Sequence, residues 1–326
     1  APVYAQLERT IPGTHAAAAI EAGLEPNQAH VNTERLEIGL HYYNVRLCVP
    51  AGAAASCGGA SETFAVHRLG DRTTPISAAL GNISDPDLRQ CLSDATIGAD
   101  EVGEVTQVSC RSYGVGSTDR QTALTGLDQF SELVYLDLAD NSIGSLTPIR
   151  NLLKLSTVDL SLNPINDSAE LVNFASESGV GEPRSFYRIS LTNTGDVANN
   201  IDPVSGLASL NGAGADEPPR IQRLFVSNNA ITQVPSLVGI EVLDVSGNQL
   251  RTLSSSFADA PPTCTGACID PSSSLTSMNL AGNNLGTNAT SSLSLLRDFV
   301  NLQTLLVSEI GLKSLAWLVE SSFGAL

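Results

Sequence analysis

Histidine, the side chain most often used in general acid–base catalysis, is confined to the first part of the chain. All four histidines precede residue 68, and they are His15, His30, His41 and His67. The sequence contains no G-x-S-x-G, no glycine-rich phosphate loop and no H-E-x-x-H, which are patterns that position a nucleophile, a phosphate or a catalytic zinc. The irregular spacing of the histidines favours surface or packing roles over a metal site. We therefore expect neither an enzyme nor a cofactor.

Six cysteines offer either metal ligands or disulfides, and the sequence alone does not fix their connectivity. Zinc is the competing interpretation, but the chain has no C-x-x-C pair. His41 and His67 flank Cys48 and Cys57 at a spacing that matches no familiar zinc pattern. Disulfides are favoured, which indicates an exported protein. We expect an extracellular or cell-surface location, or a periplasmic one, after removal of a signal peptide, because the sequence begins at Ala1.

The charge of the chain narrows the classes of partner. Acidic residues outnumber basic ones by 34 to 17, giving a formal net charge of −17, and Lys154 and Lys313 are the only lysines. Such a surface repels phosphate backbones and anionic lipid heads, so nucleic acid and membrane-surface partners are disfavoured. No apolar run approaches the length of a membrane span. We expect no direct membrane insertion.

A repeat of 22 residues organises much of the chain. Adding 22 to each of five positions (133 + 22 = 155, and likewise for the others) finds matching residues: Leu133, Leu136, Leu138, Asn141 and Ile143 recur as Leu155, Val158, Leu160, Asn163 and Ile165. The L-x-L alternation predicts a short strand with one buried face. The asparagine amide can donate and accept at once, so it can satisfy backbone groups where the chain leaves the strand. Between the repeats, apolar residues three apart predict a tight helical turn.

These units resemble the 22-residue repeats of internalin-like bacterial leucine-rich repeat proteins. The resemblance implies an α/β solenoid, a right-handed superhelix whose concave face is a parallel β-sheet that binds other molecules. The same pattern recurs later with variable connections, and it predicts a structural asparagine ladder of Asn141, Asn163, Asn229, Asn248 and Asn283. Thr194, Tyr113 and Ile310 stand where further asparagines would be expected.

Three parts of the chain are predicted: a small β-containing segment (1–77), a helical cap (78–104) and a solenoid of about eight irregular repeats (105–326). In the first part, residues 36–49 and 62–69 predict paired strands, and the alanine-rich residues 14–23 predict a short helix. In the second, Ser84 or Asp85 can cap a helix that begins at Pro86. The cap resembles those that shield the first coil of bacterial leucine-rich repeat solenoids.

With that fold expected, proximity along the chain predicts three disulfides. They are Cys48–Cys57, Cys91–Cys110 and Cys264–Cys268. The second would tie the cap helix to the first strand, and the third would hold a protruding loop.

The resemblance places a ligand-binding surface on the concave face. Its predicted residues are Tyr135, Asp137, Asp159, Tyr187, Arg188, Arg223, Phe225 and Asp244. Asp137 and Asp159 occupy equivalent positions, and we favour a solvated acidic strip over a calcium site because calcium takes more oxygen ligands. We predict an exported binding or adhesion module for a protein or a glycan. The alternative is a structural component that associates with copies of itself.

Overall fold

The computed structural model describes residues 71–165, 185–194, 221–232, 240–253, 274–286, 293, 296 and 299–312 in full, together with the backbone of five strands between residues 4 and 68. Within these residues, no helix is long and apolar enough to cross a membrane.

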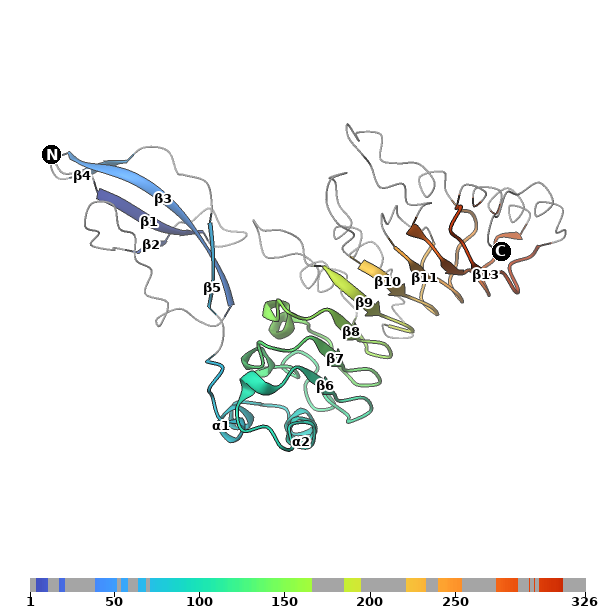
Figure 1. The fold of residues 1–326 in the computed structure, drawn as a ribbon, viewed down its shortest axis with the longest axis horizontal. Helices are drawn as coiled ribbons and strands as arrows, with labels where there is room; N and C mark the ends of the chain where they lie inside the picture. The colour runs from blue at the N-terminus through green and yellow to red at the C-terminus, as the bar shows by residue number, and fades with distance from the viewer. Residues whose placement is uncertain are drawn as a thin grey trace.

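The N-terminal strands form an antiparallel sheet with the order β2-β1-β3-β4, in which β5 also pairs with β3 (Figure 1). The predicted pairing of residues 36–49 with 62–69 is confirmed as β3 with β5. The predicted helix at residues 14–23 is wrong, because part of it is β2, where backbone pairing with β1 overrides the helix propensity of alanine. Cys48 and Cys57 are Cα partners in the β3–β4 register. The strands are β1 (Tyr4–Thr10), β2 (Ala18–Ile20), β3 (Gly39–Ala51), β4 (Ala54–Cys57) and β5 (Phe64–Arg68).

Two short helices, α1 (Ile76–Gly81) and α2 (Pro86–Ala95), precede the repeats. Helix α2 begins where the sequence predicts, because the Asp85 carboxylate accepts hydrogen bonds from the backbone N–H groups of Asp87 and Leu88 at 3.0 and 2.9 Å. The other oxygen of the Asp85 carboxylate accepts from the Gly116 N–H at 3.0 Å. The Asp85 side chain therefore caps the N-terminus of the helix and also links it by a hydrogen bond to the first coil.

A disulfide between Cys91 on α2 and Cys110, just after the first repeat strand, covalently joins the cap to the solenoid. The two Cα atoms are 5.5 Å apart, and both side chains are fully buried. This predicted bond is confirmed. Cys264 and Cys268 lie outside the described residues.

Eight parallel strands follow one another in sequence order along a second, open sheet (Figure 1). The register aligns the apolar centres of successive strands, so the repeat alignment made from sequence is confirmed. The strands are β6 (Gln107–Ser109), β7 (Tyr135–Asp137), β8 (Thr157–Asp159), β9 (Phe186–Ser190), β10 (Ile221–Phe225), β11 (Val242–Asp244), β12 (Ser277–Asn279) and β13 (Thr304–Leu306). The connections include the 3-10 helices η2 (Val102–Glu104), η3 (Leu127–Gln129) and η4 (Thr147–Asn151).

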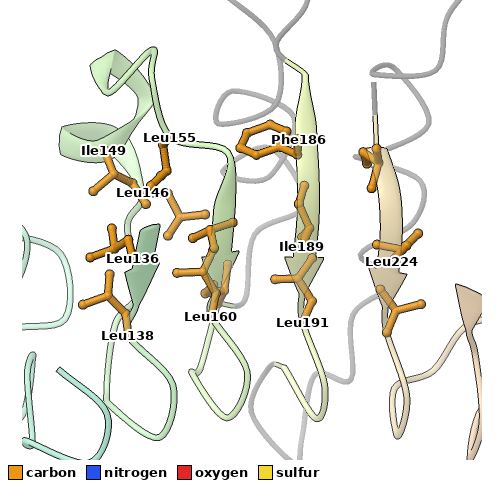
Figure 2. Packing of buried hydrophobic residues seen from close by; sticks show 14 of the residues in the cluster. Leu136, Leu138, Leu146, Ile149, Leu155, Leu160, Phe186, Ile189, Leu191 and Leu224 are labelled. Carbon is orange, nitrogen blue, oxygen red and sulfur yellow. The ribbon is translucent and has the colours of Figure 1, made fainter. Parts of the chain in front are cut away.

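The core runs continuously along the solenoid between the sheet and these connections. Figure 2 shows Leu136 and Leu138 from β7 and the residue after it, facing the same interior as Leu146 and Ile149. All four are at most 1% exposed. The spacing of three residues suits the 3-10 helix η4, as the sequence predicts. No coil buries its apolar residues by itself, so stability depends on stacking against neighbours.

The five ladder asparagines join neighbouring coils through their side-chain amides. Asn163 donates from Nδ2 to the carbonyls of Leu138 and Leu160 at 2.9 and 3.0 Å, and its Oδ1 accepts from the Ile143 N–H at 3.0 Å. Its own coil and the preceding one are thereby bonded at once. The same arrangement recurs at Asn141, Asn229, Asn248 and Asn283, each of which is buried.

The ladder is replaced at three coils, each in a different way. Tyr113 turns outward at the cap and donates from its hydroxyl to Asp94 at 3.2 Å. Ile310 is fully buried and fills the position with hydrocarbon. Thr194 is also buried, but its hydroxyl has no hydrogen-bond partner. The solenoid therefore contains one unsatisfied polar group in line with its structural amides.

Candidate binding face

The strand side chains that point away from the core form two rows, which together we call the outer sheet face. Each strand centre is buried, and the residues on either side of it point outward. Seven of the eight residues predicted for ligand binding fall on these rows, and Tyr187 lies one position before Arg188. The first row is Gln107, Tyr135, Thr157, Arg188, Arg223, Val242, Ser277 and Thr304, and the second is Ser109, Asp137, Asp159, Ser190, Phe225, Asp244, Asn279 and Leu306.

The acidic residues on the second row are engaged in turns at the strand ends. Asp137, Asp159 and Asp244 each accept a hydrogen bond from the backbone N–H two residues further on, at 3.0 Å in all three cases. This is the local side-chain-to-backbone bond that aspartate and asparagine form readily in turns. Asn279 makes the equivalent bond on β12 at 3.1 Å. These side chains therefore have a structural role in the repeat itself.

Arg111 neutralises the acidic pair at the cap end of the outer sheet face. Its Nε donates to Asp137 Oδ2 at 3.0 Å and an η-nitrogen donates to Asp159 Oδ2 at 2.8 Å. Asp137 is only 5% exposed, so it contributes little surface. A guanidinium between two carboxylates leaves no need for a cation there. Among the described residues, no group of three or more histidine, cysteine, aspartate or glutamate side chains is arranged to hold a metal ion.

Two arginines and two aromatic residues meet at the centre of the outer sheet face, and we call these four the arginine–aromatic cluster: Tyr187, Arg188, Arg223 and Phe225. The Arg188 guanidinium carbon lies 4.5 Å from the centre of the Phe225 ring, and that of Arg223 lies 4.9 Å from the centre of the Tyr187 ring. Each contact spans β9 and β10, which pair in parallel. Such cation–π contacts hold the long arginine side chains in defined positions.

Two members of the cluster, Tyr187 and Arg188, are exposed, and Arg223 and Phe225 are half-buried. Tyr187 is 45% exposed and is among the large apolar side chains most open to solvent. Arg188 donates from Nε to the Ser190 hydroxyl at 3.2 Å, whereas the Nε of Arg223 is buried without an acceptor. Within the described part of the chain, neither guanidinium forms an ion pair with a carboxylate.

Tyr135 is the remaining predicted residue. Its backbone pairs with Gln107 and Thr157, and its side chain is half-buried on the first row. Arg111 is the residue beside the outer sheet face that the sequence did not single out. It lies after the first strand, where the repeat is degenerate. Its position two residues beyond the Asp137 equivalent, Ser109, was the available signal. The four histidines lie outside the residues whose side chains are described.

Comparison with known proteins identifies the fold. No family model and no curated protein matches the sequence. Among solved structures, internalin C2 from Listeria monocytogenes shares 20% identity, with 78% of this chain and 96% of that one covered at a TM-score of 0.54. The chain is a leucine-rich repeat solenoid. Matches at lower TM-scores include a leucine-rich repeat protein of Leptospira interrogans (20% identity, 60% of this chain and 42% of that one, 0.39) and internalin F of Listeria monocytogenes (17%, 77% and 96%, 0.24).

The identity to internalin C2 is low, so the likeness establishes the architecture of this leucine-rich repeat solenoid and not its ligand. The α/β solenoid predicted from the repeat is confirmed by the open sheet of eight parallel strands. What the solenoid binds must be argued from its own surface.

Proposed function

We propose that this solenoid is an exported binding module that recognises a protein or glycan ligand through its outer sheet face. The observation that carries the proposal is the arginine–aromatic cluster. It brings exposed aromatic area and two guanidinium groups together at the middle of the sheet. Tyrosine and arginine, together with tryptophan, are the side chains most enriched among residues that dominate binding energy.

Preorganisation supports the same proposal. Immobilising a rotamer-rich side chain on binding costs about 0.5–1.5 kcal/mol. In the cluster, stacking on aromatic rings and the bond from Arg188 to Ser190 already restrict both arginines before any ligand arrives. A ligand that contacts them therefore loses less free energy to ordering.

The cap disulfide supports export. Structural disulfides persist in oxidising compartments and are rare in the reducing cytosol. The bond between Cys91 and Cys110 is buried where the cap meets the first strand. It fits an extracellular, cell-surface or periplasmic protein.

Affinity capture with matched variants tests the binding face. Purified wild-type chain is immobilised and exposed to host or envelope extracts, beside a Tyr187→Ala/Phe225→Ala double variant. The control is Ile97→Ser, which removes an apolar side chain that is 83% exposed in the turn after helix α2 of the cap. We expect the double variant to lose the bound proteins or glycans while the control keeps them, with melting curves showing that all three proteins are folded.

The proposal fails if the double variant, still folded, captures the same molecules as the wild type. Light scattering on the same samples addresses the structural alternative. A mass that rises with concentration to a defined oligomer, without capture of any other molecule, would favour self-assembly.

A further inference from the structure

The centre of the outer sheet face carries two adjacent like charges that no carboxylate of the described residues neutralises. Arg188 and Arg223 are direct Cα partners in the β9–β10 register. Like charges directly opposite on neighbouring strands destabilise a sheet. Elsewhere on the same face the chain does compensate, since Arg111 is paired with both Asp137 and Asp159. The described residues offer no such carboxylate to Arg188 or Arg223.

The surroundings limit what kind of anion fits. The positive area is narrow, because the register partners that flank Arg188 and Arg223 are the uncharged Thr157 on β8 and Val242 on β11. On β11, Asp244 is also the Cα partner of Phe225. An extended polyanion, such as a sulfated glycan or a nucleic acid, would run from the two arginines onto these uncharged residues and onto the Asp244 carboxylate. A short group of negative charges with uncharged flanks would contact the two arginines without this mismatch.

The stacking geometry also favours carboxylates over sugar rings. Glycans commonly use the open faces of aromatic rings, but one face of Tyr187 and one face of Phe225 are already covered by guanidinium groups. The planar guanidinium keeps its outer N–H groups available for paired hydrogen bonds to carboxylate oxygens. At physiological salt the Debye length is about 8 Å, so the net charge of −17 acts weakly on a group already in contact with the cluster.

We propose that the arginine–aromatic cluster binds a protein partner through a short acidic segment, two neighbouring Asp or Glu carboxylates flanked by uncharged residues. The inference rests on the proposed binding function and specifies the chemistry of its ligand. One carboxylate meets each guanidinium, and an uncharged flanking residue lies beside Tyr187.

The test uses the full chain and three defined probes. The first is an end-blocked peptide with a central Glu-Glu in a Gly/Ser context, the second is the same peptide with Gln-Gln, and the third is a sulfated hexasaccharide. Binding is measured by thermophoresis of the labelled protein for wild type, Arg188→Gln, Arg223→Gln and Arg223→Lys. Arg120→Gln, on an exposed loop, is the matched control for net charge. Melting curves establish that each variant is folded.

We expect the Glu-Glu peptide to bind and the Gln-Gln peptide to bind at least about tenfold more weakly, since a charged hydrogen bond typically contributes that much. Each Arg→Gln variant should weaken the Glu-Glu complex by about tenfold, with Arg223→Lys between it and wild type and Arg120→Gln unchanged. Equal binding of the two peptides overturns the inference, as does equal loss in Arg120→Gln. Binding of the hexasaccharide without the Glu-Glu peptide also overturns it, in favour of a glycan. If capture from extracts depends on Tyr187 and Phe225 but not on the arginine charges, the binding function stands and only this inference fails.

Discussion

Arg188 and Arg223 are direct register partners on β9 and β10, and each lays its guanidinium over an aromatic ring of the neighbouring strand. The two contacts cross, because Arg188 on β9 covers Phe225 on β10, and Arg223 on β10 covers Tyr187 on β9. Two like charges side by side would repel, and attraction to the electron-rich ring faces offsets part of that repulsion. The crossed stacks therefore join two strands while leaving a positive centre on the sheet.

A double-mutant cycle between Arg188 and Phe225 should detect this contact. We expect Arg188→Gln and Phe225→Leu to show a coupling free energy of about 0.5–1 kcal/mol in chemical unfolding, the magnitude of an exposed cation–π pair. Strictly additive effects of the two substitutions would mean that the stacked arrangement is not populated in solution.

Replacing a ladder asparagine should destabilise the solenoid. Asn163→Ala removes an amide that is 1% exposed and bonded to two coils, and it leaves the carbonyls of Leu138 and Leu160 without that donor. The expected loss is about 1–3 kcal/mol in the free energy of unfolding, measured by urea titration. Asn284→Ala is the matched control, because Asn284 is exposed beside ladder residue Asn283 and should change stability by less than about 0.5 kcal/mol. Equal effects of the two changes would contradict the ladder's role.

Two threonines in one coil should respond to valine with opposite signs. Thr194→Val removes a buried hydroxyl that has no partner, so it should raise the melting temperature. Thr192→Val removes a hydroxyl that lies 3.1 Å from the Ser227 hydroxyl, so it should lower the melting temperature. Differential scanning calorimetry measures both. A drop for Thr194→Val would show that its hydroxyl is satisfied.

Stability should depend on pH through Asp128 in η3. Burial raises the pKa of the Asp128 carboxyl above its ordinary value, because desolvation penalises the charged form. The folded state therefore holds this proton more tightly than the unfolded state. The resulting stabilisation is complete below the unfolded pKa of 3.8 and is lost as the pH rises through the folded pKa.

Asp128→Asn should accordingly raise the melting temperature at pH 7, and the difference from wild type should vanish at acidic pH where Asp128 is protonated. Thermal melts across this range measure it, with Asp100→Asn, on an exposed loop residue, as the control. A variant that is less stable than wild type at pH 7 would contradict the desolvation argument.

The repeat could be predicted from the sequence because its positions have strict physical requirements. The strand centres must be apolar, and the turn after each strand must satisfy buried backbone groups. Residues such as Leu136 and Asn141 can therefore be identified by their type and spacing. The cap helix was readable for the same reason, since Asp85 and Pro86 fit a helix start. The alanine-rich segment was misread because alanine favours helices locally, whereas pairing with β1 is a contact between distant residues.

The arrangement of the outer sheet face could be predicted from the sequence only in part. Tyr187 was predicted on the face and is exposed, although strict alternation from Ile189 would turn it toward the core, because the buried Phe186 occupies that side at the start of β9. The sequence placed Asp137 and Asp159 on the face, but Arg111, which neutralises them, lies in the degenerate first repeat and was not singled out. Likewise, the equivalence of Arg188 and Arg223 followed from the repeat, while their crossed stacking depends on side-chain directions across two strands.

Site-specific photo-crosslinking tests most directly whether the outer sheet face is the binding surface. A photoreactive phenylalanine analogue replaces Gln222, which precedes Arg223 on β10 and is half-buried beside the cluster, or Arg120, which is exposed away from the strands. After illumination in the same extract, mass spectrometry identifies the adducts at each position. The account predicts a discrete adduct from position 222 and none from position 120. Adducts from position 120 alone would contradict it.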